Sequence, residues 1–363
     1  MISQCKHLYT IMYNSLNLIT FRFFQLLTAI FETIYKSVKY TSIEICAGAG
    51  GQAIGLEQAG FDHVALVEIE PLACMTLRYN RPEWNVISKD VKLFSAKSYS
   101  NIDLFAGGVP CPPFSIAGKQ LGNMDERDLF PEALRLVSEC SPKAVMLENV
   151  RGLLSNKFSE YRKQIISELE AMGYIADWRL LNASDYGVSQ LRPRAILVAL
   201  KKEYYQYFSW PEKSISTPIS VGDLLYEEMS SLGWENARNW ANGANAVAPT
   251  IVGGSKKHGG ADLGPTRSKL AWANLGIDGR GLADKPPVNG SLVMPKLTLK
   301  MTALIQGFPH EWKFVGKKTP AYRQVGNAFP PPVAKAVGQS IIKAFELYEQ
   351  KSTARTGIEI EAA

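Results

Sequence analysis

The chain has 363 residues, of which 46% are hydrophobic and 20% are charged. This is the composition of a globular protein with a substantial core, with room for one large domain and a smaller one, and it excludes a disordered or fibrous chain. The net charge of +6 permits a polyanionic partner without proving one. The five cysteines are odd in number and lack a CxxC pair or metal-ligand spacing, so we expect reduced thiols and no metal site.

Residues 1–39 are predicted to form an apolar extension of uncertain role. The stretch 11–34 is apolar and aromatic, but polar residues such as Arg22 and Gln25 interrupt it. It therefore falls short of the roughly 20 apolar residues of a membrane span, and it lacks a clear cleavage site. We expect an amphipathic helix packed on the main domain or an over-extended start, with a membrane anchor as the less favoured alternative.

A nucleotide-binding unit is predicted directly after this extension. Residues 41–46 form a short apolar strand, 47–51 a glycine-rich turn and 52–59 a helix, and a second apolar strand over 63–67 ends at Glu68. An acidic residue about 20 positions beyond such glycines is placed to accept hydrogen bonds from a ribose. By itself this pattern fits NAD, FAD and S-adenosylmethionine about equally.

The alternation of strands and helices continues as far as residue 200. The further segments are predicted strands at 86–91, 102–105, 144–147, 175–181 and 195–200, and helices at 129–140 and 158–172. These elements predict an open α/β sheet whose ligands bind at the carboxyl ends of the strands. Polar or glycine residues follow five of those ends, namely Gly48, Glu68, Asp90, Cys111 and Glu148.

A second, smaller domain is predicted where this alternation stops. From residue 251 to 300 the chain has eight lysines and arginines but three aspartates, an excess of five positive charges. A local positive patch is what phosphate binding requires. We predict a catalytic and cofactor-binding domain at 40–200, a target-recognition domain at 201–318, a return to the first domain at 319–350, and a disordered tail at 351–363.

Several motifs together give the chain a family resemblance. In order along the chain, the matching blocks are 44–51, 67–70, 90–91, 108–115, 127–130, 148–150, 185–194, 297–309 and 324–334. Across residues 41–345 the chain resembles bacterial DNA (cytosine-5-)-methyltransferases. The resemblance implies an S-adenosylmethionine-dependent, Rossmann-like α/β sheet with a smaller DNA-recognition domain. Glu44 and Cys46 stand where the family usually has aspartate and an adenine-packing phenylalanine.

The catalytic chemistry is predicted from a thiol and a carboxyl group. Cys111 lies between prolines that restrict its backbone, and a thiol of pKa about 8.5 supplies some thiolate at neutral pH. We expect Cys111 to attack carbon 6 of a cytosine while Glu148 acts on ring nitrogen 3, with Asn149 bracing the loop. By resemblance, Arg192 contacts the target cytosine or a nearby phosphate, and Arg194 holds the catalytic loop.

The donor pocket is predicted from the same strand ends. Glu68 is expected to take the ribose hydroxyls and Ile69 to lie against the adenine, while Asp90, with Val91 beside it, accepts from the adenine amino group. The whole set of expected cofactor-binding residues is Ala47, Gly48, Gly50, Gly51, Glu68, Ile69, Asp90, Val91, Pro110 and Asn327.

The expected reaction is methyl transfer from S-adenosylmethionine to carbon 5 of a cytosine flipped out of duplex DNA. Gln190 is also expected to support the strand that carries both arginines. The expected DNA-binding residues are Ser115, Gln190, Lys256, Lys257, Arg267 and Lys269. We expect a monomer in the bacterial cytoplasm, at the nucleoid, that protects host DNA from a companion restriction endonuclease, and no membrane contact.

Two other functions stay open from the sequence. A tRNA cytosine methyltransferase of the same architecture would carry a later Cys-Phe-Thr string, whereas no cysteine follows Cys140 here. A non-catalytic binding protein would not need Cys111, Glu148 and both arginines intact. The motifs therefore favour DNA as the substrate and catalysis as the activity.

Overall fold

The computed structural model describes residues 40–110, 128–214, 217–253 and 260–361, with side chains as far as residue 353. Residues 40–363 cluster as one unit, and the predicted extension at 1–39 lies outside the described ranges. No helix within those ranges has the length and apolar character needed to span a membrane.

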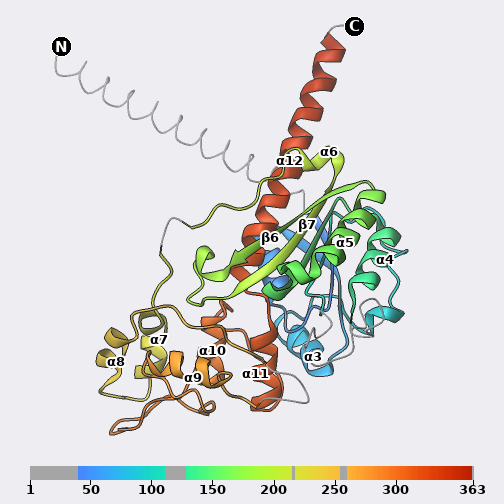
Figure 1. Ribbon diagram of the computed structural model, residues 1–363. Coiled ribbons are helices and arrows are strands. Elements are labelled where there is room, and N and C mark those ends of the chain that lie inside the picture. The colour runs from blue at the N-terminus through green and yellow to red at the C-terminus, as the bar shows by residue number, and fades with distance from the viewer. Residues whose placement is uncertain (1–39, 111–127, 215–216, 254–259, 362–363) are drawn as a thin grey trace, which may run out of the picture. The chain divides into compact units, whose positions relative to one another are not determined.

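A seven-stranded sheet forms the centre of this unit, which confirms the predicted α/β class (Figure 1). The strand order is β3-β2-β1-β4-β5-β7-β6, in which all neighbours are parallel except β7, which runs antiparallel to both β5 and β6. The strands are β1 Tyr40–Ile45, β2 Phe61–Glu68, β3 Val86–Ser88, β4 Leu104–Gly107, β5 Ala144–Val150, β6 Tyr174–Asn182 and β7 Pro193–Lys201.

Helices cover both faces of the sheet because its inner strands are apolar on both sides. In β4, Phe105 packs into a cluster with α4 (Phe130–Cys140) and α5 (Ser159–Ala171). Its neighbour Leu104 points to the opposite cluster, which contains residues of α2 (Gly51–Ala59) and α12 (Pro331–Glu361). The two-residue period of a strand produces this division.

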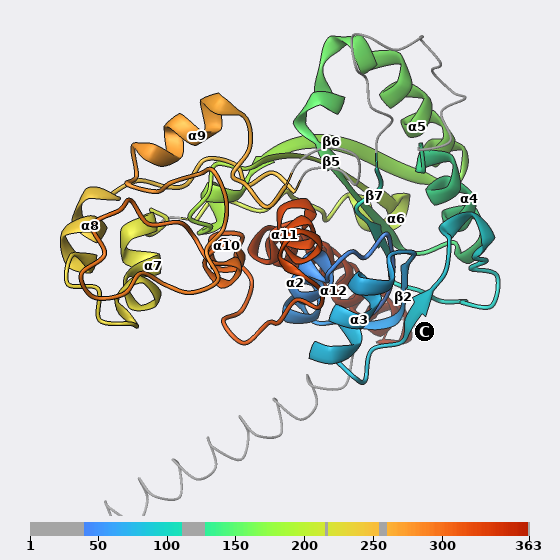
Figure 2. The ribbon, with the colours of Figure 1, turned by 90° about the horizontal axis from the view of Figure 1, so that it is seen from below.

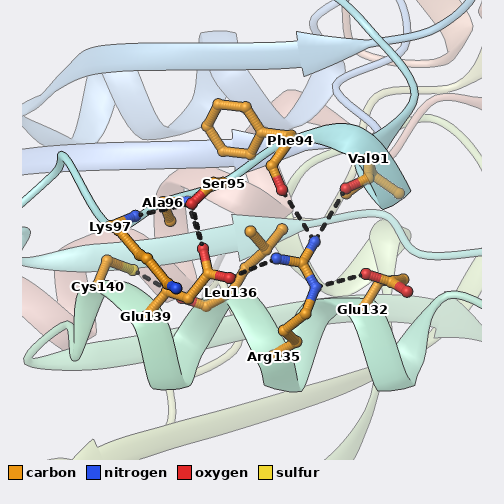
Figure 3. Close-up of polar contacts among 10 residues, drawn as sticks. All are labelled: Val91, Phe94, Ser95, Ala96, Lys97, Glu132, Arg135, Leu136, Glu139 and Cys140. Carbon is orange, nitrogen blue, oxygen red and sulfur yellow. Dashed lines mark hydrogen bonds and ion pairs between the residues drawn. The ribbon is translucent and has the colours of Figure 1, made fainter.

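Arg135 ties α4 to the segment that follows β3 (Figure 3). Its guanidinium pairs with Glu132 and Glu139 on the same helix, and Nη2 donates to the carbonyl oxygens of Val91 and Phe94. Glu139 in turn accepts from the backbone of Ala96 at 2.7 Å. The loop between β3 and β4 is therefore fixed to the helix layer rather than left to project from the sheet.

The strand predicted at 86–91 is shorter in the structure, and one α-helix between two strands of the sheet was not predicted. β3 ends at Ser88 because the carboxylate of Asp90 caps the 3-10 helix η1 (Val91–Leu93) by accepting from the backbone of Lys92. The unpredicted helix α3 (Pro71–Asn80) begins with proline at its first position. The other short helices are η3 Arg151–Leu154, η4 Asn156–Phe158, η5 Ala183–Tyr186 and α6 Lys202–Tyr205.

The region after the sheet has a hydrophobic core of its own. Trp234, Trp240 and Trp272 are buried there together. Figure 2 shows α7, α8 and α9 grouped beside the sheet, with α10 and α11 between them and α12. These helices are α7 Val221–Ser230, α8 Ala237–Gly243, α9 Thr266–Ala273, α10 Leu299–Ile305 and α11 Lys318–Asn327. A separate core of this kind supports the proposal of a second domain.

The chain returns to the sheet through α12. A Cβ atom at Gly55 of α2 would lie 2.3 Å from the carbonyl oxygen of Pro331, so only glycine permits this approach of the two helices. α12 continues to Glu361, which corrects the predicted disorder of residues 351–361. Its long red ribbon extends past the sheet in Figure 1.

Candidate active site

A cleft of about 1320 Å³ lies at the carboxyl ends of the central strands. The residues that line it come from the ends of β1, β2, β4 and β5, from β7, from the segment 250–253, and from α11 with the residues after it. Sheet residues, the segment 250–253 and α11 therefore meet in one place, at the carboxyl ends of the strands where open α/β sheets bind their ligands.

Glu148 and Arg194 form an ion pair in this cleft. Nε of Arg194 lies 2.7 Å from Oε1 of Glu148, and both side chains are almost fully buried. The pair forms because β5 and β7 are neighbours in the sheet. Burial raises the pKa of the Glu148 carboxyl, while Arg194 and Arg192 oppose this rise. A carboxyl group of this kind is suited to proton donation near neutral pH.

Asn149 holds the segment that leads to Cys111. Its Nδ2 atom donates a 2.9 Å hydrogen bond to the carbonyl oxygen of Val109, forty residues earlier. Pro110 and Glu148 both line the cleft, whereas Cys111 and Ser115 lie outside the described residues. The structure thus directs the chain toward the cleft just before the predicted nucleophile. The contact also agrees with a bracing role for Asn149.

Arg192 braces the walls of the cleft. It is 1% exposed, and its Nη1 donates to the carbonyl oxygen of Ile251, while Nη2 donates to those of Gly326 and Ala328. Only its Nε atom lacks a partner within the described residues. The predicted division of roles is thereby corrected, since Arg194 contacts the Glu148 carboxyl and Arg192 fixes the late segments.

Gln190 is fully buried, so the prediction that it contacts DNA is wrong. Its Nε2 donates to Oε1 of Gln306 at 2.7 Å, and its Oε1 accepts from the backbone of Ile251 at 2.9 Å. A side chain with both ends occupied inside the protein has no donor left for a phosphate or base. Its predicted support of the strand that carries both arginines agrees with these contacts.

The glycine-rich turn is joined to the end of β2. Gly48 has φ of +54°, and its backbone nitrogen donates a 2.7 Å hydrogen bond to Oε2 of Glu68. Ala47, Gly48, Gly51 and Glu68 all line the cleft. Gly50 does not, because it faces Leu77 and Trp312, where a Cβ atom would lie 2.8 Å and 3.0 Å from them. Its predicted contact with the cofactor is therefore corrected to a packing role.

Two buried polar side chains lack partners and face this cleft. Both carboxylate oxygens of Glu44 and both amide atoms of Gln52 have no hydrogen-bond partner among the described residues. Burial, with the nearby Glu68, raises the pKa of Glu44. Because unpaired buried polar groups are unfavourable, the site fits a ligand that carries positive charge and hydrogen-bonding groups. S-adenosylmethionine has a sulfonium and an ammonium group and meets both requirements.

Of the other predicted cofactor-binding residues, some line the cleft and some do not. Asn327 lines the cleft, while Ile69 and Asp90 do not belong to its lining and their roles stay predictions. The side chain of Val91 is 5% exposed and packs in the core cluster that includes residues of α4, while its backbone carbonyl oxygen accepts from Arg135 (Figure 3). A side chain in that position has no access to a ligand, so the predicted contact of Val91 is wrong.

The positive patch predicted for residues 251–300 is partly neutralised by ion pairs. Lys269 pairs with Asp262 at 2.8 Å, Arg280 with Asp278 at 2.9 Å and Lys300 with Glu228 at 2.6 Å. Arg267 is exposed on α9 and stays a candidate for phosphate contact. Lys256 and Lys257 lie outside the described residues. Asp262 and Asp278 already belong to the count for residues 251–300, whereas Glu228 comes from α7, so the count overstates the positive charge only around Lys300.

Gln52 and Arg323 are among the polar lining residues that were not predicted from the sequence. Gln52 directly follows the glycine-rich turn, and Arg323 directly precedes the Gln-Val-Gly-Asn block. Because each residue adjoins one of the family motifs, its position in the sequence could have indicated that it lines the cleft.

Comparison with known proteins matches this architecture to one family. The family model "C-5 cytosine-specific DNA methylase" covers residues 40–343 of the chain. The chain belongs to this family. Relatives of this DNA methylase include the Type II methyltransferase M.NgoMIV of Neisseria gonorrhoeae, 57% identical over 85% of the chain and 99% of the relative. The Type II methyltransferase M.NaeI of Lentzea aerocolonigenes is 55% identical over 84% of the chain and 75% of the relative.

Solved structures give the same fold at lower identity. A DNA modification methyltransferase encoded within an E. coli prophage superposes on this DNA methylase with a TM-score of 0.60 and 23% identity, over 85% of the chain and 99% of that structure. Together with the family match, the Type II relatives confirm the prediction of a DNA cytosine methylase over the tRNA alternative.

Proposed function

We propose that this DNA methylase transfers a methyl group from S-adenosylmethionine to carbon 5 of a cytosine flipped out of a specific duplex site. The observation that carries the proposal is the buried Glu148–Arg194 pair in the cleft, next to the segment that Asn149 directs toward Cys111. The cofactor supplies an electrophilic methyl group.

The chain's residues supply the nucleophile and the proton. The Cys111 thiolate adds to carbon 6 of the cytosine, and Glu148 donates a proton or hydrogen bond to nitrogen 3, so that carbon 5 becomes nucleophilic and takes the methyl group. Loss of the proton from carbon 5 then breaks the bond between sulfur and carbon 6, which releases the thiolate and the methylated base. Arg194 occupies Oε1 of Glu148, and a Cβ atom at Gly108 would lie 3.4 Å from Oε2. The absence of a side chain at Gly108 leaves room beside the carboxyl for the base.

The wider setting follows from the relatives. Both are named Type II methyltransferases, which supports a role in protecting host DNA from a restriction endonuclease that acts on the same site. Duplex DNA is the substrate in this proposal. The proposed enzyme works as a monomer in the bacterial cytoplasm at the nucleoid.

A mechanism-based trap tests this proposal. Duplex DNA in which the target cytosine is replaced by 5-fluorocytosine is incubated with enzyme and S-adenosylmethionine. Because fluorine at carbon 5 blocks release, we expect a covalent protein–DNA complex on a denaturing gel. Cys111→Ser removes the thiol, and no complex is expected with it.

The target site is found first, by bisulfite sequencing of DNA from cells that express the chain. If the wild-type enzyme methylates this DNA but forms no complex with the fluorinated duplex, the covalent mechanism is wrong. If no cytosine becomes methylated, the proposed activity itself is contradicted.

A further inference from the structure

Arg323 lies on the face of α11 that lines the cleft. Pro320, Arg323, Gln324 and Asn327 all belong to the lining, which is the spacing of a single helical face. Arg323 thus lies one turn before Asn327. Its side chain is partly buried, so it belongs to the wall of the cleft rather than to the outer surface.

The charge of Arg323 is not balanced inside the protein. Within the described residues its guanidinium makes no ion pair or hydrogen bond, and its Nε atom is buried without a partner. The other arginines of the cleft are occupied, since Arg194 pairs with Glu148 and Arg192 donates to three carbonyl oxygens. A guanidinium has five N–H donors, and leaving them unpaired in a partly dry site is unfavourable.

The helix around Arg323 also contacts the segment that enters the predicted DNA-binding loop. A Cβ atom at Gly253 would lie 2.8 Å from the carbonyl oxygen of Arg323 and 2.3 Å from Oδ1 of Asn327. Lys256 and Lys257, both predicted to contact DNA, follow Gly253 by three and four residues. Arg323 therefore lies between Asn327, which is predicted to bind the cofactor, and the segment that leads to the predicted DNA-binding lysines.

We propose that Arg323 is an anion-binding residue, which takes a pair of negatively charged oxygens brought into the cleft by a substrate. Given the proposed function, there are two sources of such oxygens: a backbone phosphate of the DNA and the carboxylate of the cofactor's amino-acid end. Both match the planar fork of a guanidinium, which binds two oxygens at once.

Binding measurements on the full chain distinguish the two sources. Arg323→Gln removes the charge, and Lys343→Gln removes one exposed charge from α12, outside the cleft lining, as a matched control. Affinity for S-adenosylhomocysteine is measured by calorimetry. Affinity for a labelled duplex with the mapped site is measured over a series of salt concentrations.

If the oxygens are those of a phosphate, Arg323→Gln weakens DNA binding and lowers the slope of log K against log salt by about 0.9, with cofactor affinity unchanged. If they belong to the cofactor, its affinity falls about tenfold to a hundredfold, the typical range for a charged hydrogen bond, while the salt slope stays the same. Lys343→Gln is expected to leave both affinities at wild-type values.

Arg323→Lys guards against a simple folding defect. It keeps the charge but loses the fork, so we expect a smaller loss in the same assay that responds to Arg323→Gln. Wild-type affinities for both ligands in both Arg323 variants would overturn the proposal. A wild-type chain that binds DNA and S-adenosylhomocysteine but transfers no methyl group would contradict the proposed function. The binding measurements on the Arg323 variants would still test the anion-binding proposal, because they do not depend on methyl transfer.

Discussion

Nη1 of Arg192 donates a 2.7 Å hydrogen bond to the carbonyl oxygen of Ile251, although 59 positions separate the two residues. Nη2 of the same side chain donates to the carbonyl oxygens of Gly326 and Ala328. One buried guanidinium therefore fixes the segment at Ile251 and the segment 326–328 against the residue that precedes β7. The shape of the cleft depends on this junction.

Arg192→Lys is expected to destabilise the fold. A lysine ammonium is a single centre that cannot reach all three carbonyl oxygens, and each buried group left without a partner costs about 1–3 kcal/mol. We expect a loss of about 2–5 kcal/mol in the free energy of unfolding, measured with urea. Arg151→Lys makes the same change at an arginine that is exposed on η3, and it is expected to be neutral. Equal stability of both variants would show that the junction contributes little.

Gly326→Ala is expected to open the same junction from the other side. A Cβ atom there would lie 2.3 Å from the backbone nitrogen of Gly253 and 2.4 Å from its Cα, so one segment has to move. We expect a loss of about 1–3 kcal/mol in stability and a higher KM for the cofactor, because Asn327 is displaced with it. At Gly243 of α8 a Cβ atom meets no atom within 4 Å, and Gly243→Ala is the matched control. A Gly326→Ala protein with wild-type stability and KM would contradict this close contact.

Glu148→Gln is expected to slow turnover while leaving DNA binding intact. The amide cannot donate a proton, so we expect a decrease of about 10²–10⁴-fold in kcat. Because burial raises the pKa of Glu148 and the acid form is the active one, the wild-type rate is expected to fall as pH rises through that pKa. Single-turnover methyl transfer measured from acid to alkaline pH checks both statements. A variant with wild-type kcat would exclude Glu148 as the acid.

The parts of the site that follow strand ends were predictable from the sequence. Glu68 and Glu148 come at the ends of apolar strands, and parallel neighbours bring such ends to one edge of the sheet. The sequence also predicted that Asn149 supports the loop, and its contact with Val109 agrees. These features depend on which residues directly follow an apolar strand, and the hydrophobic pattern of the sequence shows where such strands end.

Features that depend on long-range pairing were not predictable in this way. The spacing of Arg192 and Arg194 does not say which of them meets Glu148, since the register of β5 against β7 decides it. Lys300 counts as a free charge in the sequence until the fold brings Glu228 to it. Val91 follows a predicted strand end, but η1 turns its side chain into the core.

His63 makes stability depend on pH. Its Nε2 bonds to the carbonyl oxygen of Ala53 at 2.9 Å, its Nδ1 bonds to the hydroxyl of Ser42 at 2.8 Å, and its ring packs edge-on against Trp84. Burial is the largest cause that lowers its pKa below the ordinary value of 6.5. The unfolded chain therefore takes up a proton at a higher pH than the folded protein does.

The sign of the effect follows from this difference in proton uptake. Above about pH 6.5 both states carry a neutral imidazole and His63 adds no pH dependence, whereas below it stability falls by up to about 1.4 kcal/mol per pH unit until the folded pKa is reached. We expect His63→Gln, which keeps a hydrogen-bonding side chain without a titrating ring, to lose less stability than the wild type between pH 7.5 and 5.5 in urea unfolding. Carboxyl groups such as Glu44 titrate equally in both proteins, so the difference between the two curves isolates His63. If the two curves run parallel, the imidazole is not held neutral by its position between β1 and α2.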